Sequence, residues 1–418
     1  MQKIQTCEPK KVGQLLSTLV LFLGAFLNQS CLVFGINFSI ADIILLVAVI
    51  TLFMKKLFVL PFKPFFFFIM VSTSVLFASM VVAPALFSID PSPTRIFSDY
   101  IKLLVVFFYF IVGYNLAKLG LDVKIFDGFS MIAIIVGAFS LVPFFLGKGF
   151  EFMYHENSYR FQGLMIDPNY FSVLQCCACA YIFSERNRHF KKIAMFLLTI
   201  SILMSGSKTG VIVLCIYFII RFIMRFFNLK INLNSVLFWF TVVVVIPILV
   251  REWNFFMNFL SDKIPPFNRI AVLFTTDLGT SSISKIGSGR NITWATGMSL
   301  INASPIFGIG VGTYTTITSS VLGVKKIAHN TYLQLAAEWG LPLALLFFIF
   351  VIWLLTQSNQ KRTNLKMVDI YRDIVLIFLL GSLTLSLNNA RLFWVTLGLL
   401  FWFKLNSDKN KLVSYGNN

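Results

Sequence analysis

The chain has 418 residues, of which 57% are hydrophobic and only 12% are charged, and its mean hydropathy is +0.83. Soluble proteins carry about 25% charged residues, so this composition excludes a soluble globular fold. The formal net charge is +18, but the basic residues are spread over separate short segments with no recognition motif between them, which argues against binding to nucleic acid.

Apolar runs recur along the chain, and a helix of about 20 residues crosses about 30 Å of hydrocarbon. We therefore predict an all-α integral membrane protein with about twelve transmembrane helices. The predicted spans are residues 12–26, 40–54, 64–82, 101–117, 128–146, 169–183, 193–204, 209–226, 235–250, 332–355, 374–387 and 392–403. They divide the chain into a part with nine spans at 1–250, a long outer-face loop with short helices at 251–331, and three spans with a cytoplasmic tail at 332–418.

The basic residues orient these spans. Lysine and arginine resist translocation and therefore mark cytoplasmic loops. With the N-terminus inside, most of the 35 lysines and arginines fall on the inner side, and the short outer loop at 28–38 carries no charge. Both termini are therefore predicted to be cytoplasmic, and the segments 154–169, 205–210 and 251–330 to lie on the outer face.

Two short outer segments carry cations beside a span end. Residues 160–170 read RFQGLMIDPNY, in which Asp167-Pro168-Asn169 is a natural helix start next to Arg160. Residues 205–210 read SGSKTG, a polar turn that brings Lys208 to the membrane surface but lacks the spacing of a phosphate-binding loop. Each segment could also be a plain turn or a capped helix with a neighbouring surface cation.

The stretch 289–341 holds the densest group of candidate functional residues in the chain. It contains Arg290, a glycine-rich turn with Gly308, Gly310 and Gly312, and the dipeptide His329–Asn330 directly before a span. Glycine at alternate positions permits tight turning and close approach of a ligand. A histidine can accept and return a proton near neutral pH, although it could equally be a structural residue at a helix cap.

Cations on the outer face run against the usual charge bias and need an explanation. Arg160, Lys208, Arg290 and Arg391 each lie at a span end or inside a patterned segment. One explanation is an anionic ligand at the outer surface, because guanidinium binds phosphate through two hydrogen bonds and stays protonated. The other is anchoring to lipid headgroups and local salt bridges. The six cysteines and three histidines show no metal-binding spacing, so no metal site is predicted.

Taken together, these segments resemble the O-antigen ligase/polymerase superfamily of bacterial membrane glycosyltransferases. The resemblance covers residues 160–341, and its motifs are RFQGLMIDPN at 160–169, SKTG at 207–210, GR…W at 289–294, PIFGIGVG at 305–312, HNTYL at 329–333 and EWGL at 338–341. Lys208 stands where the family pattern has arginine, which is the one departure within these motifs.

The resemblance implies transfer of a glycan from an undecaprenyl-diphosphate carrier to an acceptor hydroxyl on the outer face of the plasma (inner) membrane. His329 would deprotonate the hydroxyl, and Arg290, helped by Arg160 and Lys208, would stabilise the diphosphate. Asn330 would orient the acceptor or the histidine. The turn at Gly308, Gly310 and Gly312 would line the sugar path, and Arg391 would add a further contact to the substrate.

Such a transferase is expected to need neither metal nor cofactor and to invert the anomeric carbon if attack is direct. Its expected partners are the lipid-linked oligosaccharide and the bilayer, with a chain-length regulator and a flippase. Three functions remain open: a Wzy-type polymerase that extends O-antigen or capsule repeats, which we favour because no ligase-specific feature stands out; an O-antigen ligase that transfers glycan to lipid A-core; and a flippase or transporter of the same lipid. The last would be marked by inverted repeats, and none is evident.

Overall fold

The computed structural model describes residues 13–33, 36–90, 92–143, 149–156, 158–184, 190–227, 266, 269–270, 290–321, 323, 327–356 and 362–415. The predicted span at 235–250, the Lys325–Lys326 pair and most of the predicted outer loop lie outside these ranges. The domain division therefore stays a prediction.

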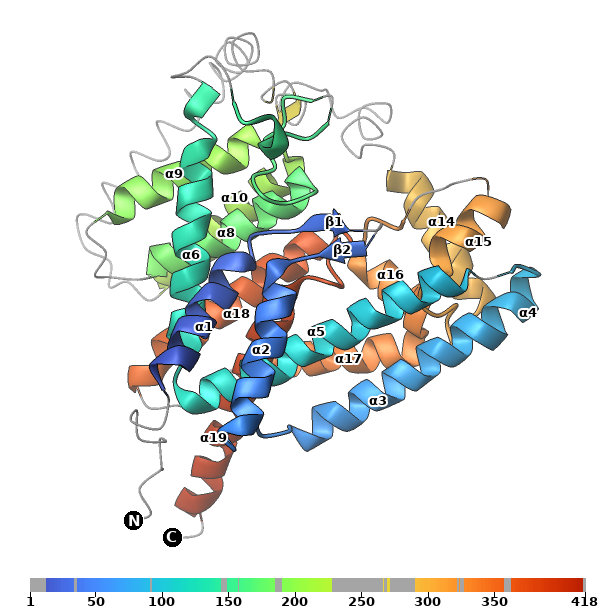
Figure 1. Ribbon diagram of the computed structural model, residues 1–418, viewed down its shortest axis with the longest axis horizontal. Coiled ribbons are helices and arrows are strands. Elements are labelled where there is room, and N and C mark those ends of the chain that lie inside the picture. Colours follow the sequence, from blue (N-terminus) through green and yellow to red (C-terminus); the bar gives the residue numbers. More distant parts are fainter. Residues whose placement is uncertain are drawn as a thin grey trace.

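The described part of the chain is helical apart from one small hairpin (Figure 1). Its α-helices are α1 (Gln14–Phe26), α2 (Ile40–Met54), α3 (Phe62–Phe77), α4 (Ala83–Phe87), α5 (Pro93–Leu119), α6 (Asp122–Phe139), α8 (Pro168–Ser184), α9 (Lys191–Met204), α10 (Lys208–Phe227), α14 (Arg290–Ala303), α15 (Tyr314–Val321), α16 (Thr331–Trp339), α17 (Leu341–Leu355), α18 (Arg362–Ser382) and α19 (Arg391–Tyr415). A π-helical turn at Ala78–Val82 joins α3 to α4, and a 3₁₀ turn covers Glu151–Met153.

The all-α prediction is confirmed, but the number of transmembrane helices is not. Within the described ranges two continuous helices are long and apolar enough to cross a bilayer, Phe62–Phe87 and Pro93–Leu119. Three further apolar helices are shorter: Gln14–Phe26, Ile40–Met54 and Leu341–Leu355. The predicted boundaries agree best for α2, where Ser39 accepts from Ala41 N at 3.1 Å and Asp42 accepts from Ser39 N at 2.9 Å, closing the first turn.

Two features depart from the predicted pattern. Strands β1 (Cys31–Val33) and β2 (Ile36–Phe38) form an antiparallel hairpin, with Cys31 opposite Phe38, in what was expected to be an uncharged loop. The predicted span at 332–355 is divided into α16 and α17, because Gly340 adopts φ +79°, a conformation that interrupts an α-helix.

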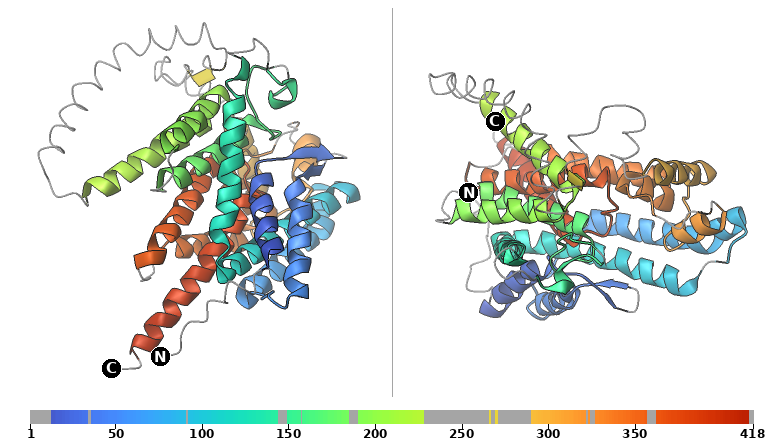
Figure 2. Two further views of the ribbon diagram at one scale, coloured as in Figure 1. Left: turned by 60° about the vertical axis from the view of Figure 1, so that its left-hand side comes forward. Right: turned by 90° about the horizontal axis from the view of Figure 1, so that it is seen from above.

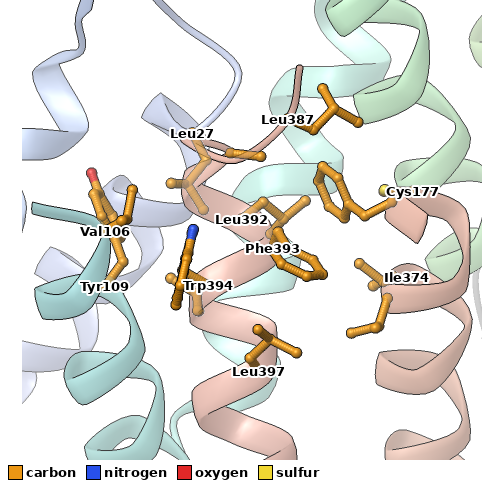
Figure 3. Close-up of a cluster of buried hydrophobic side chains, with 14 of the residues drawn as sticks. Leu27, Val106, Tyr109, Cys177, Ile374, Leu387, Leu392, Phe393, Trp394 and Leu397 are labelled. Atoms are coloured by element: carbon orange, nitrogen blue, oxygen red, sulfur yellow. The ribbon is translucent and has the colours of Figure 1, made fainter. Parts of the chain in front are cut away.

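The centre of the molecule is the crossing of α5 with α19. A methyl group added to Gly113 of α5 would lie 2.2 Å from Val395 O, and one added to Gly398 of α19 would lie 2.0 Å from Phe110 O. The two backbones therefore touch through glycine on both sides, as in close helix pairs of membrane proteins. Figure 3 shows α19 pointing Trp394 toward Tyr109 of α5 and Phe393 toward Ile374 of α18.

Two groups of helices extend from this centre. Helices α8, α9 and α10, shown in green in Figures 1 and 2, pack together and against α6, and α18 joins them. Helices α14, α16 and α17 form the second group, with α14 packed on α16. The loop at 383–390, between α18 and α19, contacts residues of both groups and so joins the segments that carry the predicted site.

Candidate active site

Arg160 joins the two short outer segments. Its side chain is 8% exposed, its Nε donates to Ser205 O at 2.9 Å, and its Nη2 donates to Asn169 Oδ1 at 2.7 Å. Phe161, the next residue, pairs with Tyr154 in an isolated β-bridge, and its amide donates to Met204 O at 3.0 Å. The segments RFQGLMIDPNY and SGSKTG, distant in sequence, therefore form one structural unit around a buried guanidinium.

Both helix starts in this unit are capped by side chains, as the sequence predicted for Asp167-Pro168-Asn169. Asp167 Oδ1 accepts from Asn169 N at 2.6 Å at the start of α8, and Ser207 Oγ accepts from Gly210 N at 3.1 Å at the start of α10. Lys208 is the first residue of α10 and is half-buried. Thr209 then shares a hydrogen bond of 2.8 Å with Thr384, which fixes this turn to the loop at 383–390.

The outer cations form one electrostatic cluster, which we define as Arg160, Lys208, Arg269 and Arg290. Burial and then repulsion by Arg269 lower the pKa of Arg160 to about 10, against the attraction of Asp167, which raises it. Burial and repulsion by Arg269 also lower the pKa of Arg290, against the attraction of Asp167. These lowered pKa values indicate that Arg160 and Arg290 are partly removed from water and lie close enough to Arg269 to be repelled by it.

Lys208 is affected by the same positive charges. Burial, followed by repulsion from Arg269 and Arg290, lowers the pKa of its ammonium group below the ordinary 10.5. Three cations that the sequence singled out are thus brought together, and Arg269 is a fourth that the sequence did not assign to the site. Its position in the long outer loop was the available signal, because basic residues there oppose the positive-inside trend.

His329 and Asn330 lie directly before α16. His329 is half-buried with φ +48°, a strained conformation for a residue other than glycine. Asn330 Oδ1 accepts from Leu333 N at 3.1 Å and caps the helix, while its Nδ2 donates to Leu383 O at 3.1 Å. Both ends of the Asn330 amide are therefore fixed, directly beside His329.

The loop at 383–390 is the common support of these segments. Thr331 Oγ1 donates to Leu385 O at 2.8 Å and accepts from Leu387 N at 2.8 Å. Leu383 and Thr384 of the same loop bond Asn330 and Thr209 respectively. The histidine segment and the Lys208 turn are therefore anchored to adjacent residues, a connection that no local sequence pattern showed.

A shallow cavity of about 520 Å³ lies between α14 and α16. Trp294, Ala295 and Met298 line it from α14, and Asn330, Tyr332, Leu333 and Leu383 line it from the other side. Trp294 is one helical turn beyond Arg290, and Asn330 is next to His329. The cavity is mostly apolar, and it is lined by neighbours in sequence of the two predicted catalytic residues rather than by those residues themselves.

The glycine turn lies elsewhere. Gly308, Gly310 and Gly312 have φ of +70°, +74° and +76° and are buried. Ile309 N and Gly310 N donate to Ala337 O and Glu338 O at 2.8 and 3.0 Å, at the end of α16. The turn thus packs inside the protein, and the structure does not place it on an open sugar path.

Arg391 is also placed differently from its predicted role. Its Nε and Nη2 donate to Asp42 Oδ1 and Oδ2, each at 2.7 Å, and Tyr109 OH donates to Asp42 Oδ1 at 2.9 Å. The guanidinium is thus bound to a carboxylate of its own chain and is not part of the cationic cluster. Asp42 is an acidic residue inside the predicted span at 40–54, and an acid in that position calls for a basic partner.

In the part of the chain that the structure describes, no group of three histidine, cysteine, aspartate or glutamate residues could hold a metal ion.

Two comparisons with known proteins bear on this site. No curated protein matches the chain. Residues 193–348, which include Lys208, Arg290, His329 and Asn330, match the model of a family described as O-Antigen ligase. This match supports the resemblance of the chain to the O-antigen ligase/polymerase superfamily, whose members are membrane proteins of polysaccharide biosynthesis.

Proposed function

We propose that the protein is a polysaccharide polymerase. It transfers glycan from undecaprenyl diphosphate to a sugar hydroxyl of another lipid-linked repeat, on the outer face of the bacterial plasma membrane. The observation that carries the proposal is the cationic cluster, because Arg160, Lys208 and Arg290 come from distant segments, are partly buried and are each repelled by Arg269. Among the described residues, Asp167 is the acidic neighbour that offsets this repulsion at the two arginines.

A diphosphate fits this cluster best. Cations held together out of water repel one another, and a doubly anionic group between them removes both the repulsion and the cost of burial. Arginine binds phosphate oxygens through paired hydrogen bonds and keeps its charge at any physiological pH. Because the charge on the diphosphate grows as the glycosidic bond breaks, fixed cations stabilise the transition state more than the bound donor.

His329 supplies the base. The acceptor hydroxyl gives its proton to the imidazole while its oxygen forms the new bond to the anomeric carbon. The bond from that carbon to the diphosphate oxygen breaks, and undecaprenyl diphosphate leaves with the electron pair. One direct displacement inverts the anomeric carbon and uses no metal. Asn330, bonded at both ends of its amide, keeps His329 at the start of α16.

The apolar cavity beside Arg290 suits the carrier's isoprenoid chain. Trp294, Met298 and Leu333 give it apolar walls, and Trp294 is 38% exposed. A lipid whose diphosphate lies in the cationic cluster can lay its first isoprene units against these side chains. For the site to face the outer side of the membrane, both termini must be cytoplasmic. A flippase would then deliver the donor to this side, and a regulator would set the chain length.

The ligase is the second candidate, because the matched family is described by that activity. A single assay with purified protein in lipid nanodiscs separates the two. With lipid-linked repeats alone, a polymerase yields a ladder of longer chains. A ligase yields product only when a second acceptor lipid such as lipid A-core is added, and absence of transfer in both reactions overturns the proposal.

The same assay tests the residues. We expect His329→Ala to lower the rate about 10²- to 10⁴-fold, the usual contribution of a general base, and Arg290→Ala about 10²- to 10³-fold. Matched controls are His155→Ala and Arg95→Ala, which change an outer-loop histidine and an exposed arginine outside the cationic cluster. Full activity of His329→Ala or Arg290→Ala at wild-type expression would contradict the assigned roles.

A further inference from the structure

Arg160 is held in the cationic cluster by uncharged oxygens. It is buried, whereas Lys208 and Arg290 are half-buried. Its Nε donates to Ser205 O at 2.9 Å, and its Nη2 donates to Asn169 Oδ1 at 2.7 Å. A guanidinium has only donors, so the oxygen of the Asn169 amide must be the atom that faces it. The two groups that orient Arg160 therefore leave its charge unbalanced.

Other arginines of the described chain are paired with a carboxylate. The Nε and Nη2 of Arg391 donate to Asp42, each at 2.7 Å. Arg221 likewise forms an ion pair with Asp373. Such a pair weakens the attraction of the guanidinium for any further anion, because its charge is already balanced. Among the described residues no carboxylate is ion-paired with Arg160, so its charge remains available.

The neighbouring acid, Asp167, is engaged elsewhere. Its Oδ1 accepts from Asn169 N at 2.6 Å and so caps the start of α8. From this place it attracts Arg160 without forming an ion pair with it. In the order Asp-Pro-Asn, the acid therefore caps the helix and the amide meets the arginine. A carboxylate in place of the Asn169 amide would lie directly on the guanidinium.

An uncharged partner affects how Arg160 can bind a ligand. Two hydrogen bonds fix the plane of the guanidinium, so little side-chain freedom remains to be lost on binding. The third nitrogen, Nη1, makes no hydrogen bond to a described residue and can donate to a phosphate oxygen. An amide oxygen carries no net charge, so it repels an incoming anion far less than a carboxylate would.

We propose that Asn169 is a positioning residue that holds Arg160 through an uncharged oxygen and so keeps its positive charge available to the diphosphate of the lipid-linked donor. The inference rests on the proposed function for the identity of this ligand. It explains why an amide, and not an acid, stands at the one side-chain contact that orients Arg160.

Isothermal titration calorimetry of inorganic diphosphate with the purified protein in detergent tests this role. We expect Asn169→Ala, which removes one orienting hydrogen bond, to weaken the affinity about three- to tenfold. Asn169→Asp keeps an oxygen in the same place but adds a charge, so it should weaken the affinity more, about 10- to 100-fold at an effective dielectric constant of about 20. A residue that only supported the fold would give the opposite order, because aspartate retains the hydrogen bond that alanine loses.

Thermal unfolding separates this effect from a loss of structure. Asn169→Asp should leave the unfolding midpoint unchanged or raise it, because a negative charge is favourable in the first turn of a helix and beside a buried arginine. Affinity and stability should therefore not fall together in this variant.

Two further variants separate position from net charge. Asn302→Asp adds the same charge at an exposed position of α14 and should leave the affinity unchanged. The double variant Asp167→Asn/Asn169→Asp keeps the net charge and a capping residue before Pro168, but places the carboxylate on Arg160. It should lose affinity as Asn169→Asp does.

Three results would overturn the inference: Asn169→Asp binds diphosphate at least as tightly as Asn169→Ala, the double variant binds like wild type, or wild type binds no diphosphate. The transfer assay separates the inference from the proposed function. If wild type and Asn169→Asp transfer glycan equally fast, the role of Asn169 fails and the proposed function stands. If no transfer occurs but the affinities follow the expected order, the proposed function fails and the role of Asn169 stands.

Discussion

Lys208 is the one member of the cationic cluster that is not an arginine, and its ordinary pKa of 10.5 lies below the 12.5 of the arginines. Arginine stays protonated, whereas burial and two neighbouring guanidinium groups lower the pKa of Lys208 from the ordinary 10.5. The superfamily pattern has arginine at this position, so this protein has replaced a permanent charge with a titratable one.

This replacement predicts a pH dependence. A bound diphosphate favours the protonated ammonium of Lys208. At a pH where Lys208 of the free protein is partly deprotonated, binding must therefore be accompanied by uptake of a proton. The affinity for inorganic diphosphate should therefore be highest at neutral pH and fall as pH rises toward 10. Isothermal titration calorimetry between pH 7 and pH 10 should show this fall in wild type and a flatter profile in Lys208→Arg.

The control is Lys63→Arg, which changes an exposed lysine of α3 and should keep the wild-type profile. If wild type and Lys208→Arg gave the same profile, Lys208 would not contact the anion. Arg391 differs from Lys208, because its guanidinium, which was expected to bind substrate, is hydrogen-bonded to Asp42.

At the scale of elements, the glycine turn holds α16 against α3 and its π-helical extension. A methyl group added to Gly310 would lie 2.2 Å from Ser79 Oγ and 2.3 Å from Ser79 N. Ser79 Oγ in turn donates to Val311 O at 2.8 Å. The turn therefore depends on the absence of a side chain as well as on positive φ.

We expect Gly310→Ala to lower the free energy of unfolding by about 2–5 kcal/mol, the sum of about 1–2 for the left-handed backbone and about 1–3 for overpacking. Gly323→Ala is the matched control, because Gly323 has φ +65° and nothing within 4 Å of an added methyl group. It should lose only the backbone part, about 1–2 kcal/mol. Denaturant unfolding in detergent would measure both, and equal losses would show that packing at Ser79 is unimportant.

At the scale of the whole molecule, an ion pair joins α2, near the N-terminus, to α19, the last helix. Asp42 of α2 accepts hydrogen bonds from Ser39 N, Tyr109 OH and two nitrogens of Arg391, so it connects α2, α5 and α19. Removing the charge leaves a buried guanidinium without its counter-ion.

Asp42→Asn should therefore destabilise the protein by about 3–5 kcal/mol. The control is Asp99→Asn, which breaks the more exposed pair with Lys102 and should cost only about 0–1 kcal/mol. Comparing the two midpoints of chemical unfolding is sufficient. A loss for Asp42→Asn no greater than for Asp99→Asn would mean that α19 is held by its apolar contacts with α5 alone.

The sequence by itself determined what depends on neighbouring residues. Apolar runs predicted α2 at 40–54 and α8 from Asp167-Pro168-Asn169, because the length of a hydrophobic segment and a capping side chain act within a few residues of each other. Charge and motif spacing likewise led to Arg160, Lys208, Arg290 and His329 without any structure.

Only the tertiary structure decided which groups at a distance meet. The pairing of Arg391 with Asp42, the bridge through the loop at 383–390 and the burial of the glycine turn each join residues far apart in the chain. Whether a cation faces a ligand or a carboxylate of its own protein is set by the packing of whole helices, and no local pattern of residues contains that information.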